Sequence, residues 1–69
     1  MIKFDGWVFP KARFVAAQVR YVSAREWHVE VVVDGLTNGL DDRLTEKFDS
    51  RDKAQQRLDA FLIEFRDVA

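Results

Sequence analysis

Apolar and polar residues alternate in two stretches of the chain, residues 13–23 and residues 27–33. A period of two is typical of strands that bury one face, and both stretches are rich in valine, which favours strands. We therefore expect a first long strand, a tight connection over residues 23–26, and a second strand at the centre of a sheet. The expected inward positions are Val15, Ala17, Val19 and Tyr21 in the first strand and Trp27, Val29, Val31 and Val33 in the second.

A third strand is expected over residues 40–48, after a loop at residues 34–39 that contains two glycines, an asparagine and an aspartate. Such residues tolerate a positive φ or make local turns. Leu44 and Phe48 would point inward, and Arg43, Thr45 and Lys47 outward. Because inserted charges deter pairing between sheet edges, we expect this strand at an edge. Connections this short join neighbouring strands in antiparallel order.

The apolar period changes to that of a helix after Ser50. Asp49 or Ser50 can cap the helix, and Asp52 lies where a negative charge favours its first turn. We expect the helix to run to about Arg66 and to lay one apolar stripe on the sheet. That stripe consists of Ala54, Leu58, Phe61, Leu62 and Phe65.

The first nine residues leave two alternatives open. They form either a short hairpin around Asp5-Gly6 or a single irregular strand that Pro10 ends. The expected fold class is α+β, with a three-stranded antiparallel sheet, an optional short N-terminal strand, and one C-terminal helix packed on one face. This arrangement makes residues 1–69 a single domain. Its expected core joins Val15, Val19, Trp27, Val29, Val31, Val33, Leu44 and Phe48 to Leu58, Phe61, Leu62 and Phe65.

Composition narrows the class of protein. The chain has 69 residues, of which 48% are hydrophobic and 33% charged, as in one small globular domain. Residues 1–28 carry five basic and two acidic side chains, whereas residues 29–69 carry six basic and ten acidic ones. This division predicts a dipolar surface and not a uniformly basic one. The chain lacks cysteine, and its first residues do not resemble a signal peptide, so we expect a cytoplasmic protein without a membrane segment.

Residues with catalytic chemistry are sparse. His28 is the single histidine, and Ser23 and Ser50 lie in turn and cap positions, so a nucleophile with its base finds no support. Cysteine-based metal sites are excluded, and the acidic residues lack the spacing of a cation-binding loop. We therefore expect no enzyme activity, no cofactor and no metal site.

Two groups of residues are candidates for binding. The outward face of the expected sheet displays Gln18, Arg20, His28, Arg43, Thr45 and Lys47 around Glu30, with Phe14 and Val22 at its margins. Arginine and glutamine on such a face can reach phosphates and base edges, which makes these six residues a candidate nucleic-acid surface. The second group is the aromatic cluster Phe4, Trp7, Phe9 and Phe14. A chain this short has little interior room for every ring, and exposed aromatics mark protein interfaces.

The stretch from Trp27 to Phe65 resembles the arm-binding domains of tyrosine integrases and the plant AP2 domains. The resemblance lies in the valine strand, the glycine turn, the Phe48-Asp49-Ser50 segment before the helix, and Ala54 on the helix. It implies DNA binding through the sheet, although those domains are typically basic and this chain has a net charge of −1.

In size, layout and lack of site chemistry, the chain is also similar to phage-encoded anti-CRISPR inhibitors. That resemblance implies a non-catalytic module, encoded by a phage or mobile element, that inhibits a host complex. Our first expectation is therefore a protein-binding module with a protein partner, a second copy of the chain among the options. The alternative is a DNA-binding domain that uses the outward sheet face.

Overall fold

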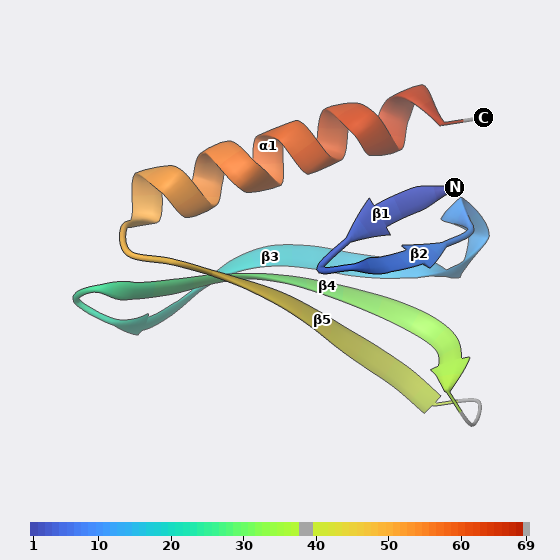
Figure 1. Ribbon diagram of the computed structural model, residues 1–69, viewed down its shortest axis with the longest axis horizontal. Helices are drawn as coiled ribbons and strands as arrows, with labels where there is room; N and C mark the ends of the chain where they lie inside the picture. Colours follow the sequence, from blue (N-terminus) through green and yellow to red (C-terminus); the bar gives the residue numbers. More distant parts are fainter. Residues whose placement is uncertain (38–39, 69) are drawn as a thin grey trace.

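The computed structural model describes residues 1–37 and 40–68, with the side chains of residues 36, 37 and 40 left out. Two sheets and one helix make up the fold (Figure 1). In chain order the elements are β1 (Ile2–Phe4), β2 (Trp7–Phe9), a 3₁₀ turn (Lys11–Arg13), β3 (Phe14–Ser23), β4 (Glu26–Thr37), β5 (Leu40–Phe48) and α1 (Arg51–Asp67). The expected α+β class and the C-terminal helix are confirmed.

The larger sheet is antiparallel, with β4 between β3 and β5. Its register places Val19 opposite Val29 and Gln18 opposite Glu30. On the other side of β4, Leu44 lies opposite Val31. Because side chains alternate between the two faces of a strand, the valines and Leu44 share one face, and Gln18 and Glu30 share the other.

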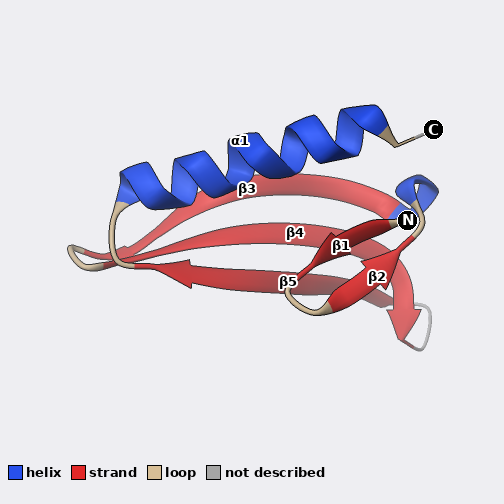
Figure 2. Cartoon of the chain, turned by 45° about the horizontal axis from the view of Figure 1, so that its top comes forward, coloured by secondary structure: helices blue, strands red, loops and turns tan. Residues whose placement is uncertain are grey.

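One face of this sheet is covered by two elements, α1 and the β1–β2 hairpin (Figure 2). The helix packs about equally on β3 and β4 and less on β5. The hairpin contacts β5, where the side chain of Asp5 accepts a hydrogen bond from the backbone N–H of Thr45 at 3.3 Å. The opposite face of the sheet has no covering element within the described residues.

The first nine residues form the hairpin and not the single irregular strand. Asp5 and Gly6 have φ angles of 50° and 75°, so both turn residues are left-handed. Two consecutive residues with positive φ form a type I′ turn, whose twist matches the twist of the two strands that it joins. Aspartate followed by glycine is a preferred sequence for this turn. The hairpin directs Ile2, Phe4 and Phe9 toward the sheet.

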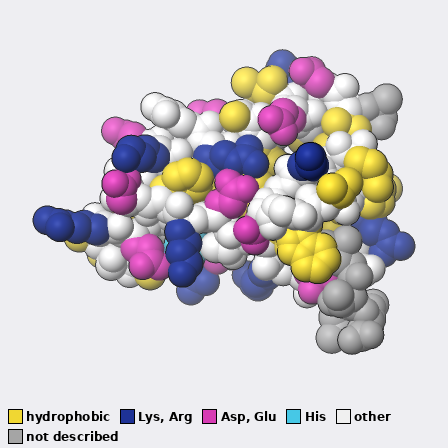
Figure 3. Space-filling view, viewed as in Figure 1, with side chains coloured by type: hydrophobic (Ala, Val, Ile, Leu, Met, Phe, Trp, Pro, Cys, Tyr) yellow, Lys and Arg dark blue, Asp and Glu magenta, His cyan; other side chains and the backbone are white. Residues whose placement is uncertain are grey.

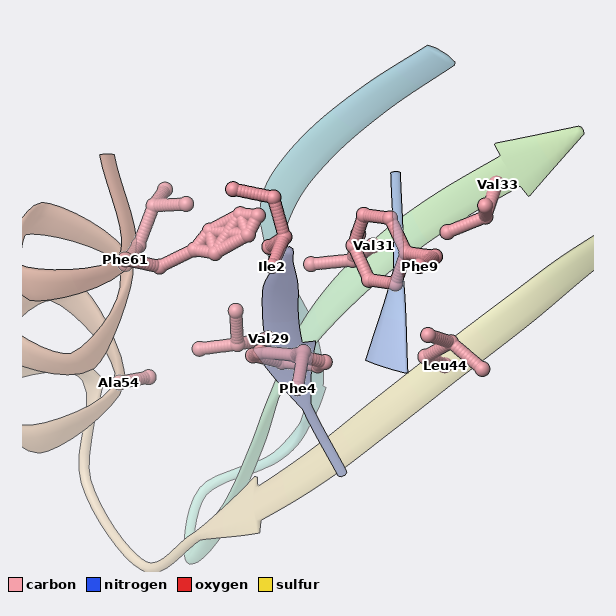
Figure 4. Packing of buried hydrophobic residues seen from close by; sticks show 10 residues of the cluster. Ile2, Phe4, Phe9, Val29, Val31, Val33, Leu44, Ala54 and Phe61 are labelled. Atoms are coloured by element: carbon pink, nitrogen blue, oxygen red, sulfur yellow. The ribbon is translucent and has the colours of Figure 1, made fainter. Parts of the chain in front are cut away.

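The core lies between the covered sheet face, the helix and the hairpin (Figure 4). Its buried residues are Ile2, Phe4, Phe9, Val29, Val31, Val33, Leu44, Ala54, Leu58 and Phe61. The Phe4 and Phe61 rings meet edge to face at 5.4 Å, which joins the hairpin to the helix. Val19, Trp27, Phe48 and Phe65 pack around this cluster and are partly buried.

Four positions differ from the sequence-based expectation. Tyr21 is predicted to be inward but is 61% exposed on the last strand of the sheet, where its ring meets the Trp27 ring edge to face at 5.1 Å. The other three differences arise from one bulge and from the end of the sheet at β3. The register of β3 shifts between Phe14 and Ala16, so Val15 is 52% exposed and Phe14 turns from the outer face to the helix. The Phe14 and Phe65 rings lie 4.5 Å apart. Leu62 is 44% exposed because none of the described strands lies beyond β3 beneath that side of the helix.

The expected loop at residues 34–39 is shorter than predicted, because β4 extends to Thr37 with an irregular register after Val33. Gly35 has a φ of 69°, and Arg13 donates from its guanidinium to the carbonyl oxygen of Gly35 at 2.9 Å. A glycine suits this position because it adopts a positive φ without steric cost. Asn38 and Gly39, the rest of the expected turn, lie outside the described residues.

The helix begins where the sequence predicts. Ser50 is extended and its hydroxyl accepts a hydrogen bond from the N–H of Lys53 at 3.3 Å, so Ser50 is the N-cap. Asp49 instead forms an ion pair with Lys53 at 3.0 Å. At the other end of the helix, the Lys11 ammonium donates to the Val68 carbonyl at 2.9 Å, which fastens the end of the helix to the start of the chain.

Candidate functional site

The open sheet face brings together all six residues of the candidate nucleic-acid surface. Gln18 and Thr45 lie on either side of Glu30, and Arg20 and Lys47 lie on either side of His28. Arg43 lies opposite Val32 on the same face. The sequence therefore predicts the membership of this face correctly, and whether it binds nucleic acid stays a prediction.

Glu30 is the centre of this face and is only 3% exposed. Its carboxylate accepts hydrogen bonds from the guanidinium groups of Arg20 at 2.9 Å and Arg43 at 3.2 Å, and from the amide of Gln18 at 3.4 Å. The hydrogen bond from Arg20 lowers the pKa of Glu30 below its usual value, against the effect of burial. Two of the three cations on this face therefore already have a carboxylate partner, which reduces the field that a phosphate would meet.

His28 lies beside this group and is also paired. Its Nε2 is 2.7 Å from a carboxylate oxygen of Glu26 at the start of the same strand. Charges of both signs are also interspersed on the side of the molecule seen in Figure 3. Neither surface carries a continuous basic stripe of the kind that follows a nucleic-acid backbone.

The N-terminal aromatic cluster divides between core and surface, which corrects the expectation for two of its residues. Phe4 and Phe9 are buried and are not available to a partner. Phe14 is partly buried, and its ring contacts the rings of Phe61 and Phe65. Only Trp7, 45% exposed, presents a large part of its ring to solvent. The hairpin register places Trp7 opposite Phe4 and on the same face as Ile2 and Phe9, but the core covers the Trp7 side chain only in part.

The outer edge of β3 is a surface that sequence reasoning missed. No described strand pairs with it, so the outward N–H and C=O groups along this strand have no ladder partner there. Of its ten residues only Arg20 is charged. Exposed apolar side chains follow the strand: Val15, Tyr21 and Val22. The signal in the sequence was this lack of charge, which differs from the charged third strand.

The opposite edge of the sheet is closed. Five of the nine residues of β5 are charged. The turn of the hairpin lies against this strand, where Thr45 donates to Asp5, and Asp5 in turn donates from its own N–H to Glu46 at 3.0 Å. Arg57 of the helix pairs with the same Glu46 at 2.8 Å. One edge of this small sheet is therefore charged and contacted by the hairpin, whereas the other edge has few charges and no paired strand among the described residues.

Leu62 extends the β3 edge onto the helix. Arg57 and Leu62 flank Phe61 on opposite sides, because Arg57 precedes it by four residues and Leu62 follows it by one. Arg57 faces the hairpin and β5, where its guanidinium lies 5.0 Å from the Phe4 ring centre. Leu62 therefore faces the side on which β3 is the last strand. We call Val15, Tyr21, Val22, Leu62 and the outer backbone of β3 the open edge.

The described residues contain no pocket and no group of three His, Asp or Glu side chains that could hold a metal ion. Among them there is also no helix with the length and apolar character needed to cross a membrane. No family model, curated protein or solved structure matches the chain. The geometry of its surfaces is therefore the basis for a functional proposal.

Proposed function

We propose that this chain is a non-catalytic protein-binding module that takes an extended segment of a partner onto the open edge. The observation that carries the proposal is the contrast between the two edges of the sheet. β5 is charged and contacted by Asp5, whereas β3 has one charge in ten residues and no paired strand on its outer side among the described residues. Natural sheets protect such edges unless something pairs with them.

Strand addition would use both properties of the open edge. Backbone hydrogen bonds to the outward N–H and C=O groups of β3 supply affinity, and pockets between alternate side chains supply specificity. The regular segment from Ala16 to Tyr21 pairs residue by residue with β4, between one bulge at each end. A partner strand of about six residues fits this segment before the bulges disturb the ladder.

The experiment selects peptides on the immobilised protein from a random twelve-residue library. We expect enriched sequences in which apolar residues alternate with polar ones, and binding that V15K weakens at least tenfold, because a lysine at the edge blocks strand pairing. I63K is the matched control, since Ile63 is 53% exposed and Val15 is 52% exposed. Thermal melting of both variants is the check that they fold.

Two results would count against strand addition. One is enrichment of peptides with a helical period, and the other is binding that I63K abolishes and V15K leaves intact. The cytoplasmic setting and the role as a phage-encoded inhibitor of a host complex remain proposals that rest on composition and on the stated resemblance.

DNA binding through the open sheet face is the rival function. One observation favours it, which is that the six candidate residues share that face. The pairing of Arg20 and Arg43 with Glu30 opposes it. We therefore rank it second.

A further inference from the structure

We infer that the partner of the open edge is a second copy of this chain, with the two β3 strands paired antiparallel in one continuous six-stranded sheet. This inference rests on the proposed function and names the partner for it. Most soluble homo-oligomers are two-fold dimers in which one surface meets itself, so the surface must be self-complementary. The edge of an antiparallel strand meets this requirement. A two-fold axis perpendicular to the sheet places the second copy of the strand antiparallel to the first, so each strand presents the same pattern of N–H and C=O groups to the other.

Charge does not oppose this pairing. Arg20 is the single charged residue of β3, and its guanidinium already donates to Glu30 at 2.9 Å. The strands can be aligned about Ala17, Gln18 or Val19 without placing the two Arg20 side chains opposite each other. By contrast, like charges directly opposite each other on paired strands destabilise a sheet. Pairing of two β5 strands would bring five charged residues from each copy together.

The position of the helix gives a second reason. The helix packs on β3 as much as on the central strand β4, and less on β5. In two copies joined at β3 by a two-fold axis perpendicular to the sheet, both helices would lie on the same face of the joined sheet, one on each side of the axis. The side of each helix above β3 would then face the other helix.

Leu62 gives a third reason. It lies on the side of the helix that would face the second helix and is 44% exposed. The isolated chain leaves it uncovered because the sheet ends at β3. A second copy supplies both the missing strand and an apolar surface for this side chain. The exposed position of Leu62, which the helical pattern predicts to be buried, therefore has an explanation in the paired form.

The chain contains no cysteine, so single cysteines can map the pairing without interference. The test places one cysteine at Ala17, Gln18 or Val19 and measures disulfide formation under mild oxidation. Residues directly opposite on antiparallel strands have Cβ atoms about 4.5 to 5.5 Å apart, so the residue on the two-fold axis should cross-link to its own copy. T45C on the closed edge is the control. We expect one β3 position to cross-link at least tenfold faster than T45C.

Sedimentation of the unmodified chain provides an independent readout. We expect a species of twice the 8.1 kDa monomer mass at micromolar concentration. V15K and L62K should each raise the dissociation constant at least tenfold, whereas V8K, on the hairpin, should not change it. Val8 is a suitable control because it is an exposed valine outside the open edge.

The outcomes separate this inference from the proposed function. If the chain sediments as a monomer and no β3 position cross-links, while selected peptides still bind in a V15K-sensitive manner, the second copy is the wrong partner and strand addition stands. If neither peptides nor a second copy engage β3, both proposals are wrong. A dimer that V15K leaves intact and that cross-links at Thr45 would place the interface on the other edge.

Discussion

At the scale of single residues, Glu30 is the feature of the open face with the clearest physical consequence. A carboxylate that is 3% exposed must be neutralised or paired, because desolvation of an isolated charge is unfavourable. Here Arg20, Arg43 and Gln18 supply the partners from the two neighbouring strands. These hydrogen bonds therefore connect β3, β4 and β5 on the open face, which neither the helix nor the hairpin covers.

The lowered pKa of Glu30 gives a pH dependence with a definite sign. Its folded-state pKa lies below the ordinary value of 4.5, so ionised Glu30 stabilises the fold above about that pH. The contribution is lost as the pH falls through the folded-state pKa. We expect E30Q to reduce the free energy of unfolding by about 1 to 2 kcal/mol at pH 7, and by less at pH 3.

Urea denaturation of the parent and of E30Q at the two pH values measures this difference. E64Q, which removes a carboxylate from the exposed face of the helix, is the control and should follow the parent at both. Equal effects of E30Q at pH 7 and pH 3 would contradict the role given to the charge.

At the scale of elements, the N-terminal hairpin serves two purposes through one turn. Its inward face supplies Ile2, Phe4 and Phe9 to the core, and its turn brings Asp5 to the edge of β5. The turn residue has a φ of 50°, a conformation that aspartate and asparagine tolerate better than other residues with a β-carbon. One residue thus closes the hairpin and covers a sheet edge.

Two substitutions of Asp5 test whether its side-chain oxygen and its tolerance of a positive φ stabilise the fold. We expect D5A to reduce the free energy of unfolding by about 1 to 3 kcal/mol, because it loses both the acceptor for Thr45 N–H and the tolerance of a positive φ. D5N keeps an oxygen acceptor and this tolerance, so it should retain most of the stability. Thermal unfolding gives the stability, and amide exchange of Thr45 reports the edge. Equal stability of the two variants would show that the side-chain oxygen is not needed.

How far the sequence predicts the fold differs between its elements. β4, β5 and α1 follow from the sequence, because each places most of its large apolar residues on one face. β3 does not, since a single extra residue at Val15 shifts which side chains face the helix. Nothing in the local pattern distinguishes this bulge from a regular strand, so Phe14 was expected outside and Val15 inside.

The candidate sites show the same limit. The polar face is predictable, since it is the complement of the valine stripe. The free edge is not, because strand order and the reach of the hairpin are tertiary properties that only the folded chain shows. Phe4 and Phe9 appear as surplus aromatics in the sequence and prove to be core residues, because the hairpin folds back over the sheet.

At the scale of the whole molecule, the distribution of charge decides how strongly DNA could bind. Only Arg20, Arg43 and Lys47 are cationic on the open face, and Glu30 pairs with two of them. Each phosphate contact releases counterions and steepens the dependence of affinity on salt. We expect a slope of log affinity against log salt no steeper than about −3, and a dissociation constant above about 1 µM at physiological salt.

Titration of duplex DNA at two salt concentrations tests this expectation. R20A/R43A is compared with R51A/R66A, which removes the same charge from the helix. Submicromolar binding that the first pair abolishes and the second leaves intact would make DNA the ligand and the open face its site.

The contact between the two ends of the chain has a further consequence for how the protein is made. Lys11 and Val68 are hydrogen-bonded across 57 residues of sequence, and the hairpin and the helix share the Phe4–Phe61 contact. Synthesis proceeds from the N-terminus at about 5 to 20 residues per second, so residues 1–11 wait roughly 3 to 11 seconds for the helix residues that cover them. During that interval Ile2, Phe4 and Phe9 have no native helix to pack against.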